Sequence, residues 1–407
     1  MGLPLAIALS KKYSVTGIDS NRKKIEEFRL GIDKNNIYEG SLECIKNIIY
    51  ENTLIKCDYF DIYVVAVPTP IDRNKNPDLT NLEEACKAVG LHMSKESIII
   101  FESTVFPTTT EKVCIPILSK YSGIKPSKIN VAYSPERISP GDKYNNLKNT
   151  SKLISATNKK TLNTVEEIYK DTVTDKTVRC SSIGIAEAAK ILENVQRDVN
   201  IALINEVSVL LKKMNLDTTE VIEAAATKWN FLPVHPGLVG GHCIGVDPYY
   251  FLEGGRNNFV DLPLIEKARE INENVPNKII SNVVTHSQRL GRANLKIGIW
   301  GLTYKKDIKD TRNSKAKDIY LKLCDILPKS DLILFDPCLK EESLDEKLVL
   351  NTKYDILLIL VNHSDFYNID ETTLINITKG DETLVFDVYG IFSNYYKLLE
   401  SVQYQRL

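Results

Sequence analysis

The chain has 407 residues, of which 43% are hydrophobic and 26% are charged, a composition typical of a soluble globular protein. Its 52 basic and 53 acidic side chains leave a formal net charge of −1. This argues against a nucleic-acid or membrane-surface protein, because both usually need a basic excess. No apolar run reaches the roughly 18 residues of a membrane-spanning helix. The length predicts two or three domains.

Eight cysteines are spread along the chain, without metal-ligand spacing and without a secretory leader before them. They are Cys44, Cys57, Cys86, Cys114, Cys180, Cys243, Cys324 and Cys338. We therefore expect mostly free thiols in a reducing compartment, and a cytoplasmic protein.

The first two-fifths of the chain alternates predicted strands and helices. The predicted strands cover residues 14–19, 62–67, 97–101 and 129–133, and the helices between them include 82–92 and 109–118. Alternation at this spacing predicts a parallel, doubly wound sheet.

The middle of the chain differs in pattern from both ends. From Gly184 to about Leu216 there is no proline or further glycine, and apolar residues recur at helical spacing, which predicts one long helix. Asp217 is expected to cap the next helix. The last third returns to strands, predicted at 296–301, 331–336, 356–360 and 383–388.

We therefore expect an α/β protein in which a central helical domain joins two doubly wound, Rossmann-like domains. The long helix would serve as a spine between domains or as a dimer surface. The predicted domains cover residues 1–184, 185–290 and 291–407.

The amino-terminal segment has some features of a dinucleotide site. Asp19 ends a predicted strand, where an acid can hydrogen-bond the adenosine ribose of NAD, although an acid at a strand end is by itself a weak signal. The glycine-rich turn that should precede the first helix is represented by Gly2 alone. The N–H groups of such a turn would hold the pyrophosphate.

The segment 237–248 is dense in glycine, so its backbone must turn sharply or approach another group closely. A cysteine in such a loop can be a nucleophile if a nearby positive charge favours the thiolate. The glycines and Asp247 favour this reading for Cys243, whereas the other seven cysteines are expected to be structural.

Two further groups combine polar side chains at places that suit chemistry. Lys190 and Asn194 are four residues apart on the predicted long helix, so they share a face and could stabilise an oxyanion, although a solvated face is the commoner use. Glu136 follows a predicted strand and could act as a base or be an ordinary turn carboxylate. Glu187 and Glu193 are expected on the surface.

The segment 301–312 follows the first predicted strand of the last third. Its Lys305, Lys306 and Arg312 suit a diphosphate, or form an ordinary charged surface loop.

In this order, the segments resemble the UDP-glucose/UDP-mannose dehydrogenase family over almost the whole chain. The motifs that carry the resemblance are Val67-Pro68-Thr69-Pro70, Glu102-Ser103-Thr104-Val105, Ser134-Pro135-Glu136-Arg137, Ala189-Lys190 with Glu193-Asn194, Gly240-Gly241-His242-Cys243 with Asp247, and Gly301-Leu302-Thr303-Tyr304-Lys305. Six motifs in the same order as in the family are not expected to arise by chance.

Two segments resemble the branch that acts on UDP-N-acetylhexosamines, most closely the UDP-N-acetylglucosamine and UDP-N-acetylgalactosamine 6-dehydrogenases. They are residues 135–143 and residues 228–233. The resemblance implies a four-electron oxidation of the sugar C6 alcohol to a carboxylate with two NAD per turnover. The family makes uronic acids for capsule, O-antigen and other surface polysaccharides.

The resemblance implies a role for each catalytic position. Cys243 would attack the C6 aldehyde to give a thiohemiacetal, which is oxidised to a thioester and hydrolysed. Lys190 and Asn194 would stabilise oxyanions, and Asp247 would help to manage the proton and water. Glu136 would activate the hydrolytic water.

Cofactor and substrate positions follow from the same resemblance. Asp19, Gly2 and Thr69 would bind the cofactor, Thr104 would hold a catalytic water or cofactor group, and Arg312 would lie where cofactor and substrate meet. The implied substrate positions are Lys190, Asn194, Phe231, Gly237, Gly240 and Lys305. The long helix resembles the family's dimer core, and the resemblance implies a homodimer with no metal.

The chain departs from the family at its start, because Gly2 aligns with the last glycine of the family's Gly-x-Gly-x-x-Gly turn. We therefore expect the chain as written to lack the strand before that turn, to bind NAD weakly and to fold less well in its first domain. Two alternatives stay open: UDP-glucose or UDP-N-acetylmannosamine as substrate, or a truncated homologue without catalysis.

Overall fold

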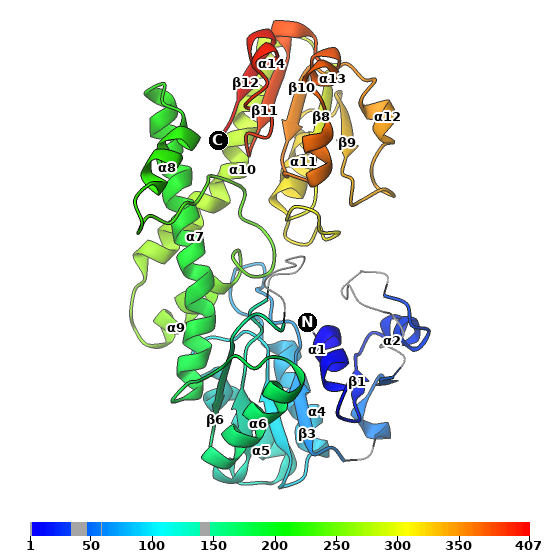
Figure 1. Cartoon of the computed structure of the whole chain (residues 1–407), viewed down its shortest axis with the longest axis vertical. Helices are drawn as coiled ribbons and strands as arrows, with labels where there is room; N and C mark the ends of the chain where they lie inside the picture. Colours follow the sequence, from blue (N-terminus) through cyan, green and yellow to red (C-terminus); the bar gives the residue numbers. More distant parts are fainter. Residues whose placement is uncertain (1, 34–46, 58, 139–146) are drawn as a thin grey trace. The chain divides into compact units, whose positions relative to one another are not determined.

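The computed structural model describes residues 2–33, 47–57, 59–138 and 147–407. The chain divides into two compact units (Figure 1). The first unit holds Met1–Glu193 with Tyr249–Asp261, and the second holds Asn194–Pro248 with Leu262–Leu407. The three-domain boundaries near residues 184 and 290 stay predictions.

The first unit contains a two-stranded and a five-stranded sheet. The smaller sheet pairs β1 (Thr16–Ile18) in parallel with β2 (Ile49–Glu51). The larger sheet has the strand order β3 (Ile62–Val65), β4 (Ile98–Phe101), β5 (Asn130–Tyr133), β6 (Lys152–Ala156) and β7 (Thr177–Arg179). Strands β3, β4 and β5 are parallel, as predicted, so their carboxyl ends share one edge. The sequence analysis did not predict β6, which runs antiparallel to β5.

The helices of the first unit cover both faces of the larger sheet, except α2, which packs against the smaller sheet. They are α1 (Gly2–Leu9), α2 (Arg22–Arg29), α4 (Thr80–His92), α5 (Ile115–Ser122) and α6 (Lys159–Thr172), with the short turns η1 (Leu54–Lys56), η2 (Thr110–Cys114) and η3 (Pro126–Lys128). The helix predicted at 109–118 begins as the π-helical turn η2. Pro116 has no N–H to continue a regular ladder, which accounts for the change at α5.

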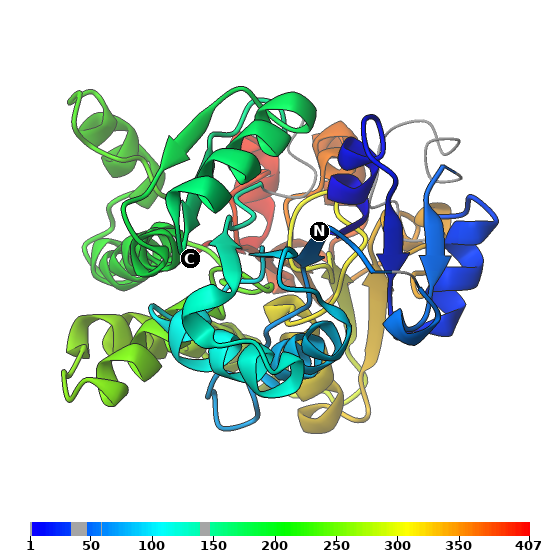
Figure 2. The same cartoon turned by 90° about the horizontal axis from the view of Figure 1, so that it is seen from below.

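Alternate residues of the strands explain the two layers. Ile99 and Val131 pack against α4 and α5, whereas their neighbours Ile100 and Ala132 pack against α1 and α6. This period of two buries both faces of the sheet, as doubly wound sheets require. Figure 2 shows α6 and the α4–α5 pair on opposite sides of the strands.

The second unit contains a fully parallel five-stranded sheet. Its strand order is β12 (Gln403–Gln405), β11 (Leu384–Asp387), β10 (Ile356–Ile359), β8 (Lys296–Trp300) and β9 (Asp331–Phe335). The chain order reverses between β8 and β10, and open α/β sheets bind ligands at the carboxyl ends of strands at such a switch point. The loops after β8, β9 and β10 therefore lie where a ligand is expected.

Helices cover both faces of this second sheet. Residues of α10 and α11 pack on one face, and α12, α13 and α14 contribute to the other. Their bounds are α10 (Pro263–Leu290), α11 (Lys315–Ile326), α12 (Glu346–Val349), α13 (Glu371–Asn376) and α14 (Tyr396–Ser401), with the turns η4 (Ser364–Asn368) and η5 (Gly380–Glu382).

The predicted long helix is present as α7 (Ile183–Lys213), which starts in the first unit and ends in the second. It is followed by α8 (Thr218–Ala226) and α9 (Asp247–Asn257). Asp217 caps α8 as predicted, because its carboxylate accepts the N–H groups of Thr219 and Glu220.

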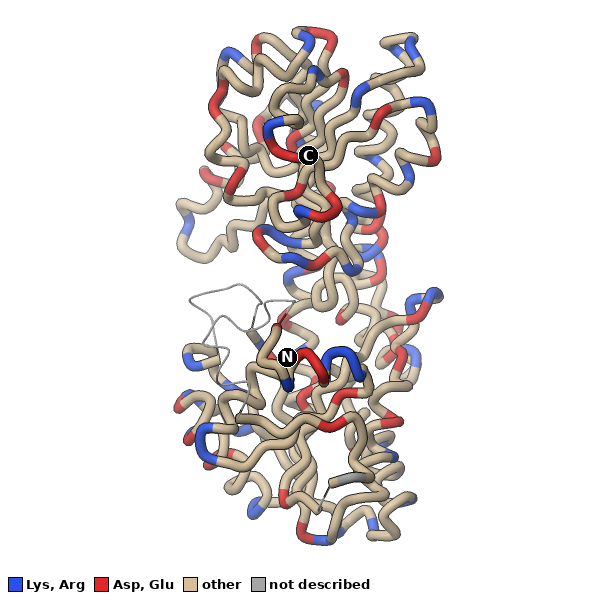
Figure 3. The backbone as a smooth tube through the Cα atoms, turned by 90° about the vertical axis from the view of Figure 1, so that its right-hand side faces the viewer, with Lys and Arg blue, Asp and Glu red and all other residues tan. Residues whose placement is uncertain are grey.

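Basic and acidic residues are interspersed along the described chain, as Figure 3 shows, in keeping with the near-zero formal charge. Among the described residues, no helix combines the length and the apolar character needed to cross a bilayer.

Candidate active site

The predicted nucleophile lies in the second unit, just before α9. The side chain of Cys243 is exposed, and its carbonyl oxygen accepts the N–H groups of Val246 at 3.1 Å and Asp247 at 2.8 Å. Cys243 therefore lies one turn ahead of Asp247, where α9 begins. The positive end of a helix favours a thiolate over a thiol, so this location suits the predicted role.

Two glycines allow the Cys243 loop to lie against the loop that follows β8. Gly241 has a φ of +80°, and a Cβ added to it would meet the Tyr304 ring at 2.6 Å. A Cβ on Gly240 would meet the carbonyl oxygen of Asn313 at 2.5 Å, and the Gly241 N–H donates to the same oxygen at 3.1 Å. The close approach predicted from the glycine density is thus an approach to protein backbone and an aromatic ring.

The structure brings together two more of the predicted catalytic residues. The Asn194 Nδ2 donates to Asp247 Oδ2 at 2.6 Å, and both side chains are buried. Lys190 lies one turn earlier on α7 and is also buried, with 7% of its surface exposed. The alternative of a solvated face for Lys190 and Asn194 is therefore wrong.

A buried polar network holds the start of the same loop. Asn205 on α7 accepts the Gly237 N–H at 2.9 Å and donates to the Gly237 carbonyl at 3.0 Å. Asn205 also bonds Asn272, which in turn donates to Asp198. A buried ion pair between Asp198 and Arg269 completes the network. Burial raises the pKa of Asp198, although Arg269 opposes that shift.

The sequence analysis missed Asp198, Asn205, Asn272 and Arg269. A signal was available, because Asp198 and Asn205 interrupt the apolar spacing of a long helix at positions that would otherwise be core. Polar side chains in such positions are normally hydrogen-bonded to one another or to backbone.

The predicted diphosphate loop follows β8 at the switch point. Lys305 is half-buried, and its carbonyl oxygen accepts the Thr303 hydroxyl at 3.0 Å. Arg312 is exposed and forms a bidentate pair with Asp310, with nitrogen–oxygen distances of 2.9 Å and 2.6 Å. Phe231, another predicted substrate residue, is half-buried just beyond α8.

In the first unit, predicted residues gather at the carboxyl edge of the larger sheet. The Thr69 hydroxyl donates to the Thr104 carbonyl oxygen at 2.7 Å, which ties together the segments after β3 and β4. The Tyr250 hydroxyl donates to the Thr69 carbonyl at 2.8 Å. The sequence analysis did not single out Tyr250.

Glu136 follows β5 at the same edge and is buried, with 7% of its surface exposed. Its Oε1 accepts the N–H groups of Arg137 at 2.8 Å and Ile138 at 2.9 Å. The side chain thus closes its own turn, as the turn-carboxylate alternative predicts. Neither of these two bonds involves Oε2, so the geometry is also compatible with Glu136 acting as a base. Ser139–Lys143, the rest of this predicted motif, lies outside the described residues.

A buried ion pair anchors the backbone ahead of Glu136. Lys152 on β6 pairs with Glu102 and also donates to the carbonyl oxygens of Ser134 at 3.1 Å and Pro135 at 3.2 Å. Burial raises the pKa of Glu102, while Lys152 opposes that shift. Lys152 was missed because its strand was not predicted.

Asp19 and Gly2 are the two residues of the first unit that were predicted to bind the ribose and the pyrophosphate of NAD, and these roles stay predictions. Asp19 follows β1, and its Oδ1 accepts the Asn21 N–H at 2.8 Å. Gly2 begins α1, and a Cβ added there would meet nothing within 4 Å, so a phosphate can approach this helix terminus. Both residues fit a dinucleotide, with the ribose at Asp19 and the pyrophosphate at Gly2.

The prediction that Glu187 is a surface residue is wrong. Its side chain is fully buried, and it accepts the N–H groups of Thr108 at 2.6 Å and Thr110 at 2.9 Å. Burial raises the pKa of Glu187 to about 7 despite these bonds. Glu193 is exposed as predicted and pairs with Arg137. The position of Glu187 on the helix could not reveal its burial, because its hydrogen-bond partners belong to a segment distant in the sequence.

Three models of one family match the chain in order. For the UDP-glucose/GDP-mannose dehydrogenase family, the NAD binding domain matches residues 1–173, the central domain residues 185–274 and the UDP binding domain residues 298–394. The second nucleotide sugar in the family's name is GDP-mannose, and not UDP-mannose as the sequence analysis named it.

Individual relatives span nearly the whole chain. A UDP-N-acetyl-D-glucosamine 6-dehydrogenase from Pseudomonas aeruginosa is 37% identical over 395 residues, which cover 94% of this chain and 93% of that protein. A UDP-N-acetyl-D-mannosamine dehydrogenase from Methanococcus maripaludis is 32% identical and covers 97% of this chain and 91% of that protein. The solved structure of UDP-D-ManNAc dehydrogenase from Pyrococcus horikoshii matches with a TM-score of 0.85 at 29% identity, covering 96% of this chain and 93% of that one.

Proposed function

This chain belongs to the UDP-glucose/GDP-mannose dehydrogenase family and is an NAD-dependent UDP-sugar 6-dehydrogenase, and we propose that its substrate is a UDP-N-acetylhexosamine. The C6 alcohol is oxidised by four electrons to a carboxylate, and the UDP-linked uronic acid serves surface polysaccharide synthesis. The observation that carries the proposal is the bond of Asn194 to Asp247, directly after the Cys243 loop.

The chemistry is divided between the cofactor and the side chains of this loop. Asp19 and Gly2 would hold NAD, which would supply the hydride acceptor for both oxidations when bound. Cys243 attacks the C6 aldehyde to form a thiohemiacetal, and the second oxidation converts this adduct to a thioester. Water then cleaves the thioester, which releases the acid and restores the thiol.

The buried polar groups supply the electrostatics of these steps. Lys190 and Asn194 donate to the oxygen that becomes negative when the thiol adds and when water attacks. Asp247, oriented by Asn194, takes up the proton of the attacking group. Glu136 activates the water, while its Oε1 accepts the two N–H groups of its own turn.

Further residues hold the substrate and the cofactor. Lys305 pairs with the diphosphate, and Phe231, Gly237 and Gly240 line the sugar nucleotide. Thr69 and Thr104 position the cofactor from the edge of the first sheet, and Arg312 contacts it beside the substrate. Positive charge on a flexible lysine suits a diphosphate.

The hexosamine assignment rests on the names of relatives and on the motif around Glu136. Relatives that match over nearly the full chain include proteins named for UDP-N-acetyl-D-glucosamine and for UDP-N-acetyl-D-mannosamine. UDP-glucose and UDP-N-acetylmannosamine are the alternative substrates, and a truncated homologue without catalysis is the remaining alternative.

Product analysis with the purified chain tests the proposal. We expect UDP-N-acetylglucosamine or its galactose epimer to yield two NADH per uronic acid, and UDP-glucose and UDP-N-acetylmannosamine to react more slowly. The Cys243→Ser variant should release free acid much more slowly than the wild type. Normal acid release by that variant would rule out the thioester route, and no oxidation of any UDP-sugar would support the non-catalytic alternative.

A further inference from the structure

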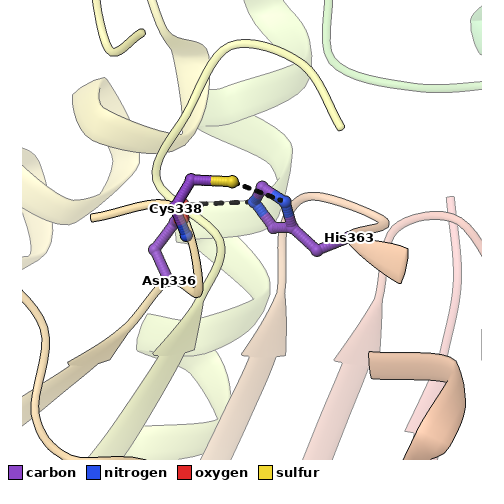
Figure 4. A group of neighbouring side chains, drawn as sticks. All are labelled: Asp336, Cys338 and His363. Atoms are coloured by element: carbon purple, nitrogen blue, oxygen red, sulfur yellow. Dashed lines mark hydrogen bonds and ion pairs between the residues drawn. The ribbon is translucent and has the colours of Figure 1, made fainter. Parts of the chain in front are cut away.

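Three side chains meet at the carboxyl ends of β9 and β10, away from the Cys243 loop in sequence. Asp336 and Cys338 follow β9, and His363 follows β10 (Figure 4). The His363 Nε2 lies 3.2 Å from Asp336 Oδ2, and its Nδ1 lies 3.7 Å from the Cys338 Sγ. The imidazole therefore bridges a thiol and a carboxylate. Its Nδ1 also accepts the Asp307 N–H at 3.1 Å, and its Nε2 lies 3.1 Å from the Thr303 hydroxyl.

The carboxylate end of this array is fixed and ionised. Asp336 is buried, and its Oδ2 accepts the N–H groups of Leu302 at 2.7 Å and Thr303 at 3.1 Å. Its Oδ1 accepts the Cys338 N–H at 2.9 Å. Burial would raise the pKa of Asp336, but the hydrogen bonds from His363 and these amides lower it below its ordinary value.

The imidazole is held in an environment that favours its protonation. His363 is fully buried, and burial alone would lower its pKa, but the contacts with Asp336 and Cys338 raise the pKa to about 9. The Asp307 Oδ1 lies 3.4 Å from Nδ1 and adds a second negative charge. The charged groups that face this ring are thus Asp336 and Asp307, with Lys306 acting on Asp307 from the next position.

The arrangement is that of a proton relay rather than of a metal chelate. One donor atom from each of Asp336, Cys338 and His363 comes within 4.8 Å of the others. However, the ring presents different nitrogens to the thiol and the carboxylate, so one ion could not take both contacts. Both oxygens of Asp336 already accept backbone N–H groups.

We propose that Cys338 is a second nucleophilic thiol of this chain, a modification site for peroxides and other soft electrophiles. His363 takes the thiol proton at Nδ1 in exchange for the Asp307 N–H that this nitrogen accepts. Asp336 is the positioning carboxylate that holds the ring. Cys338 is half-buried, so the residue is partly open to solvent. The proposal does not depend on the substrate or mechanism of the dehydrogenase.

The reaction with hydrogen peroxide balances within this array. The Cys338 thiolate attacks one peroxide oxygen, so that an S–O bond forms and the O–O bond breaks. The leaving oxygen takes the proton from His363 Nδ1 and departs as water. The sulfur is oxidised by two electrons to a sulfenic acid, and the peroxide is reduced.

Peptide mass spectrometry on the intact wild-type chain tests the proposal. The probes are iodoacetamide at about pH 6 and about pH 8, and hydrogen peroxide followed by dimedone. Alkylation at about pH 6 relative to about pH 8 should be retained at least about tenfold better at Cys338 than at Cys180, since only the thiolate reacts. Cys180 is the matched control, because it is also half-buried and burial raises its pKa. Dimedone should label Cys338 ahead of Cys180.

A variant of His363 distinguishes activation of the Cys338 thiol by the imidazole from simple exposure of the thiol to the reagent. His363→Gln should reduce Cys338 alkylation at about pH 6 to the level of Cys180, provided that circular dichroism shows the fold retained. If that variant does not fold, the wild-type pH comparison decides alone. Parallel pH dependence at Cys338 and Cys180 would overturn the proposal. So would zinc, bound one per chain in the wild-type protein and absent from Cys338→Ser.

Discussion

Asn194 on α7 and Asp247 at the start of α9 share a buried hydrogen bond of 2.6 Å between Nδ2 and Oδ2. The carbonyl of Cys243 is bonded to the N–H of Asp247, so this one contact connects the predicted nucleophile to the long helix. Orientation of the carboxylate and placement of the loop therefore depend on the same amide group.

Replacing Asn194 by alanine should lower both stability and turnover. The buried Asp247 carboxylate loses a donor, which costs about 1–3 kcal/mol. Thermal unfolding and NADH production measure the two effects. Asn274→Ala is the matched control, because Asn274 is exposed on α10 and should change stability by less than about 0.5 kcal/mol. Equal behaviour of the two variants would contradict the role assigned to the bond.

Gly241→Ala should displace the Cys243 loop. The residue has a φ of +80°, and its new Cβ would lie 2.6 Å from the Tyr304 ring. The unfavourable backbone conformation alone costs about 1–2 kcal/mol. We expect acid formation to fall at least about tenfold, measured by product chromatography.

Gly254→Ala provides the control for Gly241→Ala, because a Cβ at Gly254 meets nothing within 4 Å and the residue lies inside α9. An alanine there should be neutral or add up to about 1 kcal/mol of stability. The double variant Gly241→Ala with Tyr304→Ala removes the ring and should recover part of the lost activity. Failure to recover any would place the damage in the backbone rather than in the ring contact.

Glu187 should make the stability of the first unit fall as the pH rises. Burial raises its folded pKa to about 7 from the ordinary value of 4.5. A carboxyl whose folded pKa is raised binds more protons in the folded state between those values, so its contribution is present below about pH 4.5 and lost as the pH passes about 7. One pKa unit corresponds to about 1.4 kcal/mol, which gives a change on the order of 3 kcal/mol.

Urea unfolding of wild type and Glu187→Gln at several pH values between about 5 and 8 measures this contribution. The variant should show a flatter pH dependence than the wild type. Glu193→Gln on the same helix is exposed and should retain the wild-type slope. A steeper decline in Glu187→Gln would reverse the assigned sign.

Much of the architecture could be predicted from local patterns. Strands such as β3 and β10 are continuous apolar runs with clear ends, and α7 has a helical period over its whole length. Strands β2, β6, β7 and β12 were not predicted, because a run of three to five residues with mixed polarity carries little periodicity. The antiparallel direction of β6 depends on which edge it joins, which no local pattern encodes.

The candidate site was predictable where motifs mark it and not where partners are distant. Cys243 and its glycines stand out in the sequence, but the reason for Gly241 is the ring of Tyr304, more than sixty positions away. The burial of Glu187 likewise depends on backbone amides of another segment. Long-range packing of this kind is what a single sequence leaves out.

If α7 forms a homodimer surface, a charge on its exposed apolar stripe should separate the subunits. Leu203 and Leu210 are seven residues apart, so they share a face, and 54% and 57% of their surfaces are exposed. We expect Leu203→Lys to shift the chain toward monomer in size-exclusion chromatography with light scattering. Lys213→Glu, at the end of the same helix, is the control. An unchanged dimer in Leu203→Lys would exclude this face from the interface.

For the buried ion pair of Lys152 and Glu102, we expect replacing both residues to destabilise the fold less than replacing Lys152 alone. Lys152→Met leaves the Glu102 carboxylate buried without its cation, which costs about 3–5 kcal/mol. Adding Glu102→Gln removes that charge, while Tyr169 can still donate its hydroxyl to the side chain. We therefore expect the double variant to unfold at a higher urea concentration than Lys152→Met. Additive losses of stability would mean that the two residues contribute independently.

Lys152 also donates to the carbonyl oxygens of Ser134 and Pro135, just ahead of Glu136. Both variants should therefore misplace Glu136 and slow the release of the acid.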